Sequence, residues 1–193
     1  MHDLFFKNIT RHIALTDRER ALIASFLKQR NLRKKQYLLQ AGDVCRFETF
    51  VTTGLLRAYS VDGAGQEHIV MFAMEGWWIS ELYSLLSNTP STLNIDALED
   101  TEVLQIERGD LEKLYEEVPT LNKCFRILFQ NAFVSNQERI LAAISKTAEE
   151  RYEQFIKKYP QLEQRVPQHQ VASFLGITPE TLSRVIRKLA NDA

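Results

Sequence analysis

Residues 166–193, VPQHQVASFLGITPETLSRVIRKLANDA, carry the pattern of two short helices separated by a tight turn. Residues 168–175 form the first predicted helix, in which Val171 and Leu175 lie four apart and so share one face. Gly176 follows where that helix must end, because glycine adopts the left-handed backbone conformation that other residues avoid. The stretch therefore begins with a helix and a sharp change of direction.

A second helix is predicted directly after this turn. Thr178 fits its N-cap, and Pro179 fits its first position, where the missing N–H costs nothing. One face carries an apolar stripe at helical spacing, made of Leu182, Val185, Ile186 and Leu189. Two short helices joined by a glycine-containing turn are a helix-turn-helix, whose second helix can enter the major groove of DNA.

The polar face of the second helix has the chemistry of a base reader. Arginine can donate two hydrogen bonds to guanine, and glutamate can accept one from cytosine. Glu180, Ser183 and Arg184 lie three and four apart, so they project from the start of the helix toward one groove. A solvated polar face on an ordinary helix pair has the same spacing, and the residues alone leave that alternative open.

Composition sets the broad class. The chain has 193 residues, of which 45% are hydrophobic and 25% charged, enough for one large domain or two small ones. Its net charge is −1, but from Lys146 onward eight Lys/Arg face six Asp/Glu, so that segment is +2 and the remainder −3. This asymmetry allows DNA contact without requiring it. No apolar run reaches the roughly 18 residues of a membrane helix, and we recognise no signal peptide, so we predict a cytoplasmic protein without a membrane partner.

Candidate catalytic and metal sites are few. Cys45 and Cys124 stand far apart and alone, so they make neither a disulfide framework nor a metal or iron–sulfur ligand set. His68 beside Glu67 would need two or three clustered histidines to hold a metal, and His169 is far away in sequence. The sequence shows no nucleophile–base set and no phosphate-cradling glycine loop. We therefore predict neither an enzyme nor a metal site.

Short strands separated by turns are predicted after an N-terminal helix. They cover residues 37–39, 47–51, 55–61, 68–72, 93–98 and 102–106. Asp62-Gly63 marks a hairpin between two of them. Evenly spaced short strands favour a closed, jelly-roll-like antiparallel β-roll. The basic cluster that precedes most of these strands is interpreted as a solvated loop, with a polymerase or DNA-flank contact as the alternative; it comprises Arg30, Arg33, Lys34 and Lys35.

A long amphipathic helix follows a short helix over residues 108–116 and begins at Pro119. Its first apolar stripe alternates spacings of four and three, as in a coiled-coil seam. This stripe is the predicted dimer interface: Leu121, Phe125, Leu128, Ala132, Ser135, Arg139 and Ala142. A second stripe lies on a neighbouring face: Phe129, Phe133, Ile140 and Ile144. One stripe alone could pack on the β-roll, but two stripes suggest two partners, and a homodimer supplies the second.

Capping boxes mark two further helix starts. Thr16 and Glu19 form one box near the N-terminus, and Thr147 and Glu150 form another after the long helix. A hinge is placed at the second box. The predicted fold class is α+β, with an antiparallel β-roll sensor domain over residues 1–116, a dimerisation helix over 117–145 and a helix-turn-helix DNA-binding domain over 146–193.

With β-roll, long helix and terminal helix-turn-helix in this order, the sequence resembles the Crp/Fnr family of bacterial transcription regulators from about Asp17 to Leu189. The matching stretches are Ala41-Gly42-Asp43, Gly54-Leu55-Leu56-Arg57, Asp62-Gly63, Gly76 with Ser80-Glu81-Leu82, Ala97-Leu98-Glu99-Asp100, and Leu175-Gly176-Ile177-Thr178. The most specific, Glu180-Thr181-Leu182-Ser183-Arg184, is similar to the Glu-x-x-Ser-Arg recognition signature of the Fnr branch. The resemblance implies a cyclic-nucleotide-binding-like domain and a homodimer on double-stranded DNA, with RNA polymerase as a further partner.

The resemblance also implies roles for the polar side chains. Glu180 and Arg184 would read a C·G pair in each half-site, and Ser183 would contact a neighbouring base, each good contact giving about 1–3 kcal/mol of discrimination. A dimer would place two recognition helices about 34 Å apart on a near-palindromic site. Phosphate contacts, which position the protein without specifying sequence, are expected from Gln168, Thr178, Arg187 and Lys188, and Thr181 completes the predicted DNA-binding set.

The expected ligand pocket departs from the family pattern. Members that bind cyclic AMP open the phosphate cassette with Gly-Glu-Leu and close it with Arg-Ser/Thr-Ala. Here Ser80 replaces the glycine before Glu81 and Leu82, and Ser91 and Thr92 stand where the arginine and its neighbour should be. Without its arginine the phosphate would lose a bidentate, charge-assisted partner, which costs at least about a hundredfold in affinity. We therefore expect no tight binding of cyclic AMP and an unidentified effector at these five residues. For Glu81, which lacks its arginine partner, a structural or vestigial role is favoured over ligand binding.

Two further departures concern the cofactor and the wing. The iron–sulfur cluster of Fnr requires an N-terminal cysteine group that this sequence lacks, so no cofactor is predicted. The family usually carries a β wing after the recognition helix. The sequence ends at Ala193, a few residues past Leu189, so we expect the helix-turn-helix to lack a full wing. A subgroup without the wing and a truncated chain both fit this observation.

The sequence therefore predicts a sequence-specific DNA-binding transcription regulator. An effector in the β-roll would favour one arrangement of the long helix and hinge, and so set the spacing of the two recognition helices. The rival prediction is a small-molecule sensor or partner-binding module whose helix-turn-helix does not bind specific DNA.

Overall fold

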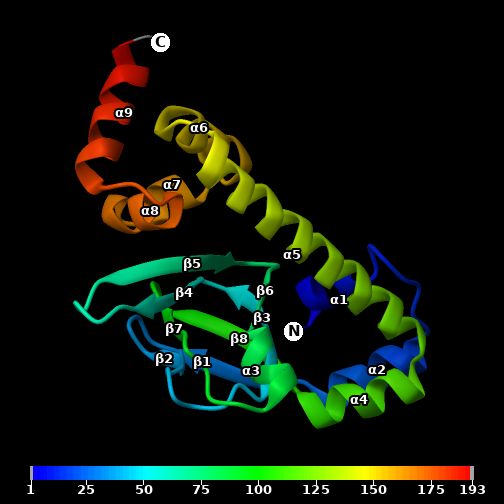
Figure 1. Ribbon diagram of the computed structural model, residues 1–193. Helices are drawn as coiled ribbons and strands as arrows, with labels where there is room; N and C mark the ends of the chain where they lie inside the picture. Colours follow the sequence, from blue (N-terminus) through cyan, green and yellow to red (C-terminus); the bar gives the residue numbers. More distant parts are fainter. Residues whose placement is uncertain (1, 192–193) are drawn as a thin grey trace. The chain divides into compact units, whose positions relative to one another are not determined.

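The computed structural model describes residues 2–191. Two short helices come first: α1 (Asp3–Ile9) and α2 (Asp17–Phe26). The strands follow, with one helix among them: β1 (Lys28–Leu32), β2 (Tyr37–Leu39), β3 (Phe47–Thr53), β4 (Leu55–Val61), β5 (Glu67–Met74), β6 (Trp78–Ile79), α3 (Leu82–Ser87), β7 (Asn94–Ala97) and β8 (Thr101–Glu107). The remainder is helical: α4 (Arg108–Glu117), α5 (Thr120–Ser145), α6 (Ala148–Lys158), α7 (Leu162–Arg165), α8 (Gln168–Leu175) and α9 (Pro179–Asn191) (Figure 1).

The strands form two four-stranded sheets, in the orders β1-β8-β3-β6 and β2-β7-β4-β5. Thr49 of β3 pairs with Gln105 of β8 in the first sheet, and β4 pairs with β7 in the second, both antiparallel. Both sheets contribute alternate side chains to one buried apolar cluster, which includes Val51, Leu56, Ala58, Ile79, Ile95 and Val103. The predicted α+β fold with an antiparallel β-roll is confirmed.

A second core joins the first sheet to the helices around it. Phe5 of α1 lies edge-on to Phe50 of β3 at 5.4 Å between ring centroids. Trp78 lies 5.2 Å from Phe50 and 5.1 Å from Phe125 of α5. Edge-to-face aromatic pairs contribute about 0.5–1.5 kcal/mol each beyond the area that they bury. The first turns of α5 are therefore committed to the core of their own chain.

Both predicted capping boxes are present. Thr16 Oγ1 accepts from the Glu19 amide at 3.3 Å, and the Glu19 carboxylate accepts from the Thr16 amide at 2.7 Å. Thr147 and Glu150 make the same reciprocal pair at the start of α6. Each box satisfies two backbone N–H groups that would otherwise lack a partner at the helix start. These local signals place the two helix starts correctly.

Five short elements were not predicted from the sequence: α1, β1, β6, α3 and α7. The β1 strand lacks an alternating apolar pattern and forms by pairing with β8, with Arg30 opposite Val103. The interpretation of Arg30 as part of a solvated loop is therefore wrong. Arg30 is half-buried in β1, and its Nη2 donates to the Tyr37 carbonyl at 2.8 Å.

The chain forms two compact units. One comprises Met1–Ser60 and Met71–Gln130, and the other comprises Val61–Val70 and Asn131–Ala193. The tip of the β4–β5 hairpin thus belongs to the same unit as the second half of α5 and the C-terminal helices. The three functional domains placed from the sequence, with boundaries after residues 116 and 145, stay predictions.

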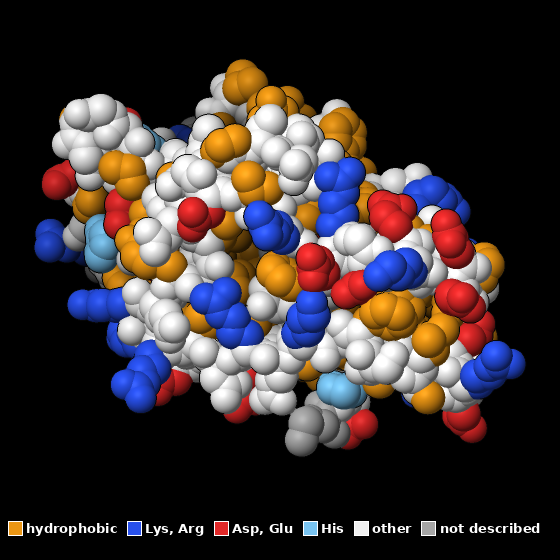
Figure 2. Space-filling view, turned by 90° about the horizontal axis from the view of Figure 1, so that it is seen from below, with side chains coloured by type: hydrophobic (Ala, Val, Ile, Leu, Met, Phe, Trp, Pro, Cys, Tyr) orange, Lys and Arg blue, Asp and Glu red, His pale blue; other side chains and the backbone are white. Residues whose placement is uncertain are grey.

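The surface carries charges of both signs. On the face shown in Figure 2, Lys and Arg side chains lie among Asp and Glu side chains and scattered hydrophobic groups. This mixture agrees with the net charge of −1 over the whole chain. Among the helices of residues 2–191, none combines the length and the apolar character needed to cross a membrane.

Candidate DNA-binding and effector sites

The helix-turn-helix is built by α8, a short turn and α9. Gly176 ends α8 with φ of +66°, the left-handed conformation predicted for it. Arg151 of α6 fixes the same turn, because its Nη1 donates to the Leu175 carbonyl at 2.7 Å. Thr178 is the predicted N-cap of α9: its Oγ1 accepts from the Thr181 amide at 3.2 Å. The turn therefore holds α9 at a defined angle to α8.

A small apolar core supports this pair of helices. Leu182 and Val185 of α9 are buried, as are Val171 and Ala172 of α8. Phe155 of α6 adds its ring, 5.8 Å from the ring of Phe174. Because α9 buries its apolar stripe here, its opposite face is presented outward.

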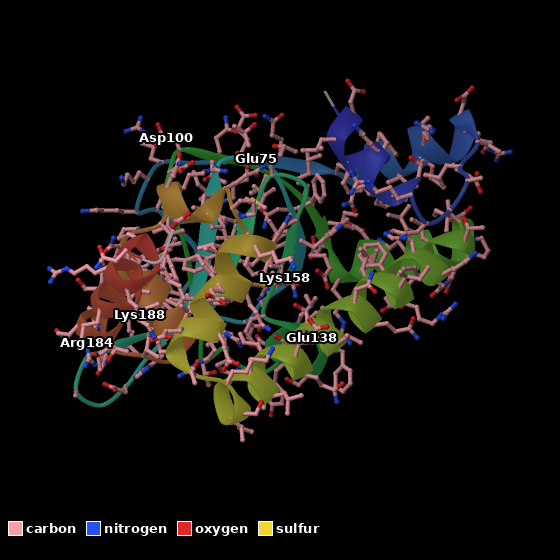
Figure 3. The ribbon with its side chains drawn as sticks, turned by 90° about the horizontal axis from the view of Figure 1, so that it is seen from above. Glu75, Asp100, Glu138, Lys158, Arg184 and Lys188 are labelled. Carbon is pink, nitrogen blue, oxygen red and sulfur yellow. The ribbon has the colours of Figure 1, made fainter. Side chains whose placement is uncertain are left out.

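The predicted DNA-binding residues all lie at this surface. Arg184 and Lys188 both belong to α9 (Figure 3). The exposed members of the set are Gln168, Thr178, Glu180, Arg184, Arg187 and Lys188, and the half-exposed ones are Thr181 and Ser183. The fold thus gathers on one pair of helices the residues that the sequence singled out.

The charged side chains on the exposed face of α9 have different interaction partners. The Glu180 backbone amide, followed by the Thr178 hydroxyl, lowers the pKa of the Glu180 carboxyl, so the side chain stays an ionised acceptor. Arg184 Nη2 donates to Thr181 Oγ1 at 3.2 Å, an exposed contact that DNA can replace. Lys188 Nζ lies 2.8 Å from the Glu149 carboxylate of α6, so its charge is shared within the chain. Glu180 and Arg184 are therefore charged and accessible, whereas Lys188 is already paired.

The two apolar stripes of the long helix α5 differ in how far they are exposed. Leu121 and Phe125 of the predicted interface are 1% and 3% exposed, inside the core of their own chain. Leu128 packs against the same core. Further along, Ser135 accepts from Lys158 at 3.1 Å, and Lys158 also lies 3.2 Å from Glu138 (Figure 3).

The neighbouring stripe of α5 is the exposed one. Phe133 is 63% exposed, Ile140 58% and Ile144 79%, with Phe129 at 37%. Exposed apolar side chains of this size at regular helical spacing are unusual on an isolated surface. A partner could therefore contact this stripe. It could not contact Leu121 and Phe125, which are buried in their own chain.

A cavity of about 400 Å³ is lined by residues from strands of both sheets and from the loop before β3. Its apolar lining includes Leu38, Leu39, Ile79 and Ile95, and its polar lining includes Arg30, Asp43, Arg46, Ser80, Thr49 and Gln105. Gln105 Nε2 donates to Thr49 Oγ1 at 3.1 Å on the buried side. A cavity that combines an apolar wall with a few placed polar groups suits a small organic ligand.

Of the five residues predicted to form the ligand pocket, Ser80 lines this cavity. Glu81 instead caps α3, where its carboxylate accepts from the Tyr83 amide at 3.1 Å and the Ser84 amide at 2.8 Å. Ser91 is buried and bonds the backbone of Leu93. Leu82 lies in α3, and Thr92 is exposed in the loop after it. Sequence reasoning missed Arg30, Thr49 and Gln105, whose approach depends on strand pairing rather than on a motif.

Glu48 is a further buried group that the sequence did not single out. Its side chain is 3% exposed, and burial raises its pKa to about 7, although a hydrogen bond from Ser80 opposes the rise. Ser80 Oγ donates to Oε2 at 2.6 Å, whereas Oε1 has no partner within residues 2–191. An uncompensated buried carboxylate is costly, so the protonated form of Glu48 predominates below its raised pKa of about 7.

The cysteines and metal-binding side chains form no cluster in the described part of the chain. Cys45 and Cys124 are both buried, and burial raises the pKa of each thiol. No group of three or more His, Cys, Asp and Glu side chains is arranged to hold a metal ion within residues 2–191.

A β-roll, a long helix and a terminal helix-turn-helix with an exposed polar face define, as a class, a DNA-binding transcription regulator. The sequence model of the cyclic nucleotide-binding domain family matches residues 29–118. The transcriptional activator protein Anr of Pseudomonas aeruginosa is 28% identical over 82% of this chain and 69% of its own length. The fumarate and nitrate reduction regulatory protein of Vibrio cholerae is 26% identical over 82% of this chain and 67% of its own length.

Solved structures with the same fold include FixK2 from Bradyrhizobium japonicum, with a TM-score of 0.76, 21% identity and coverage of 86% of this chain and 85% of that one. CooA from Carboxydothermus hydrogenoformans has a TM-score of 0.72, with 16% identity and coverage of 88% of this chain and 78% of that one. Residues 29–118 thus match the cyclic nucleotide-binding domain family, and the chain is similar over most of its length to transcription regulators of the Crp/Fnr type. The relatives named here are regulators and not enzymes.

Proposed function

We propose that this chain binds a near-palindromic DNA site as a homodimer and regulates transcription in response to an effector. The observation that carries the proposal is the outer face of α9, where Glu180 and Arg184 are exposed above a buried apolar stripe. Both side chains can enter a major groove without disturbing the core that supports them.

The chemistry of these two groups sets the expected base preference. Arg184 would donate to O6 and N7 of guanine, and Glu180 would accept from N4 of the paired cytosine. Ser183 would lie beside a neighbouring base, and Arg187 and Gln168 would contact phosphates. Two half-sites about 34 Å apart would then each contain one C·G pair at the same position relative to the dyad.

The exposed stripe of α5 supports a revised dimer interface. Phe129, Phe133, Ile140 and Ile144 recur at spacings of four, seven and four, so they form one seam along the helix. We propose this seam in place of the Leu121–Phe125 side, which is buried in its own chain. A second copy with the same seam completes the interface symmetrically.

The effector is proposed to bind in the cavity of the β-roll, with Ser80 shared between this site and the pocket predicted from the sequence. Arg30 and Arg46 give its rim a positive character, which Asp43 reduces. The phosphate arginine of cyclic-AMP-binding members is replaced by Ser91, which is engaged with the backbone of Leu93. We therefore propose that cyclic AMP is not the tightly bound effector and that no iron–sulfur cofactor is involved.

In vitro selection from random duplex DNA, with and without candidate nucleotides, tests the function directly. We expect a two-fold-symmetric sequence with a C·G pair at a fixed distance from the dyad. Selection without any enriched sequence would favour the alternative, a small-molecule sensor or partner-binding module that lacks sequence-specific DNA binding. RNA polymerase, as a further partner, would be tested by transcription from a promoter that carries the selected site.

A further inference from the structure

The first helix of the helix-turn-helix is tied to the edge of a β-strand. β5 is the last strand in the order β2-β7-β4-β5, so one of its edges faces no other strand of that sheet. Ser173 of α8 occupies part of this edge. Its Oγ accepts from the Ile69 amide at 2.9 Å and donates to the Glu67 carbonyl at 3.0 Å. One hydroxyl thus satisfies two backbone groups that a neighbouring strand would otherwise pair.

Arg139 of α5 contacts both β5 and α8. Arg139 Nη1 donates to the Val70 carbonyl at 2.8 Å, and its guanidinium lies 5.1 Å from the ring centroid of Phe174 on α8. Burial lowers the pKa of Arg139, which the nearby Tyr159 opposes, and the contacts of its guanidinium within residues 2–191 are to a carbonyl and a ring and not to a carboxylate. A half-buried arginine without an acidic partner must be held by such backbone and ring contacts.

These contacts all lie within one compact unit, formed by Val61–Val70 together with Asn131–Ala193. β5 itself continues beyond this unit, since Phe72 and Ala73 are buried among the strands. Residues 67–70 of β5 therefore lie in the same compact unit as α8, the helix that precedes the turn before α9.

We propose that Ser173 and Arg139 are positioning residues that hold α8 on the edge of β5 and thereby fix the orientation of α9 for binding two half-sites at once. The inference rests on the proposed function. Glu180 and Arg184 remain exposed while these contacts are made. The contacts are therefore compatible with base reading and do not block it.

Loss of the contacts should matter most when two reading helices must act together. One helix can bind one half-site in any orientation relative to the rest of the chain. A dimer on a palindrome must present both helices at one spacing, so each freed helix adds an ordering cost that the DNA must overcome. Ser173→Ala and Arg139→Met test this, since methionine keeps an apolar stem over Phe174 and removes the donor to Val70.

Hydrogen–deuterium exchange tests the contact itself in the full-length protein. Ser173→Ala should speed exchange of the Ile69 amide by roughly tenfold, the change expected for one lost hydrogen bond. The matched control is Ser145→Ala, because the Ser145 hydroxyl donates to the Leu141 carbonyl within the same unit and touches neither β5 nor α8. Equal exchange of Ile69 in wild type and Ser173→Ala would overturn the contact.

DNA binding tests the consequence, with a selected palindrome and a single half-site as probes. Ser173→Ala and Arg139→Met should weaken palindrome binding by roughly three- to tenfold and leave half-site affinity and base preference unchanged. Ser145→Ala and Arg126→Met, the latter an exposed arginine on α5, should match wild type on both probes.

Equal losses of affinity on both probes would show general damage to the helix-turn-helix and overturn the positioning role. Unchanged palindrome binding would overturn it as well. If wild type itself does not distinguish the palindrome, the proposed function fails, and the exchange of Ile69 alone decides whether Ser173 holds β5.

Discussion

Lys188 Nζ on α9 lies 2.8 Å from the Glu149 carboxylate on α6. The two side chains are 57% and 41% exposed, so the pair contributes at most about 1 kcal/mol to stability. Its larger effect is on charge. The pair partly cancels a positive group on the helix that is proposed to meet DNA, which leaves Arg184 and Arg187 as the stronger electrostatic contacts of α9.

Removal of the acid should release this lysine for DNA. Glu149→Gln is expected to raise affinity for both specific and random DNA by roughly two- to fivefold at low salt, with a smaller gain at high salt. A salt titration of fluorescence anisotropy measures the change. Glu153→Gln on the exposed face of the same helix alters the net charge equally, and an equal gain in that variant would show that the ion pair itself is irrelevant.

Arg184 should govern base preference through its two donors. Arg184→Ala is expected to cost about 1–3 kcal/mol on the selected site and to relax the preference at the C·G position. Arg184→Lys keeps the charge but cannot donate in the planar bidentate geometry, so it should also relax the preference. Mobility-shift competition against sites substituted at that pair measures both effects. Retention of full preference by the lysine variant would contradict bidentate reading.

Arg187 should act differently from Arg184 because it is expected to contact phosphate. Arg187→Ala should weaken all duplexes by a similar factor and reduce the dependence of affinity on salt by about one counterion. The same competition assay, repeated across salt concentrations, separates this behaviour from a loss of base preference. A change in preferred sequence in this variant would contradict its assignment.

The exposed seam of α5 should control the oligomeric state. Ile144→Asp would place a charge in a buried dimer interface and is expected to weaken self-association by at least about tenfold. Sedimentation equilibrium measures the dissociation constant. Leu86→Asp on α3, where the native side chain is 62% exposed, is the matched control and should associate as wild type does. Identical constants for the two variants would remove the seam from the interface.

Glu48 should make stability depend on pH. Its folded pKa of about 7 exceeds the ordinary value of 4.5, so the folded protein holds a proton that the unfolded chain has released between these pH values. Stability should therefore fall as pH rises from 4.5 to 7, by on the order of 3 kcal/mol, and change little above that range. Urea denaturation at pH 5 and pH 8 measures the fall. Glu48→Gln, which can still accept from Ser80, should abolish it, and parallel profiles would refute the assignment.

Short-range signals made the C-terminal helices predictable from the sequence. The turn at Gly176, the N-cap at Thr178 and the box at Thr147 involve neighbours a few residues apart, and the structure contains each of them. The same locality explains why α9 and its exposed face could be assigned before any tertiary information. The roles of these residues in DNA binding stay predictions.

Features that depend on distant partners could not be predicted in the same way. The β1 strand has no alternating pattern of its own and takes its form from β8, so Arg30 could not be placed beside Thr49 and Gln105 at one cavity. The two stripes of α5 have the same helical period. Periodicity alone cannot say that Phe125 would meet Trp78 in the core while Phe133 would stay exposed.

The Ser173 hydroxyl at the edge of β5 also affects the tendency of the protein to aggregate. An uncovered strand margin offers unpaired amide and carbonyl groups to any other chain, which is a common start of β-sheet polymerisation. While Ser173 satisfies the Ile69 amide and the Glu67 carbonyl, that part of the edge is closed. Any displacement of α8 would expose these backbone groups again. Variants that lose the Ser173 hydroxyl should therefore aggregate at lower temperatures than their melting temperatures alone would predict.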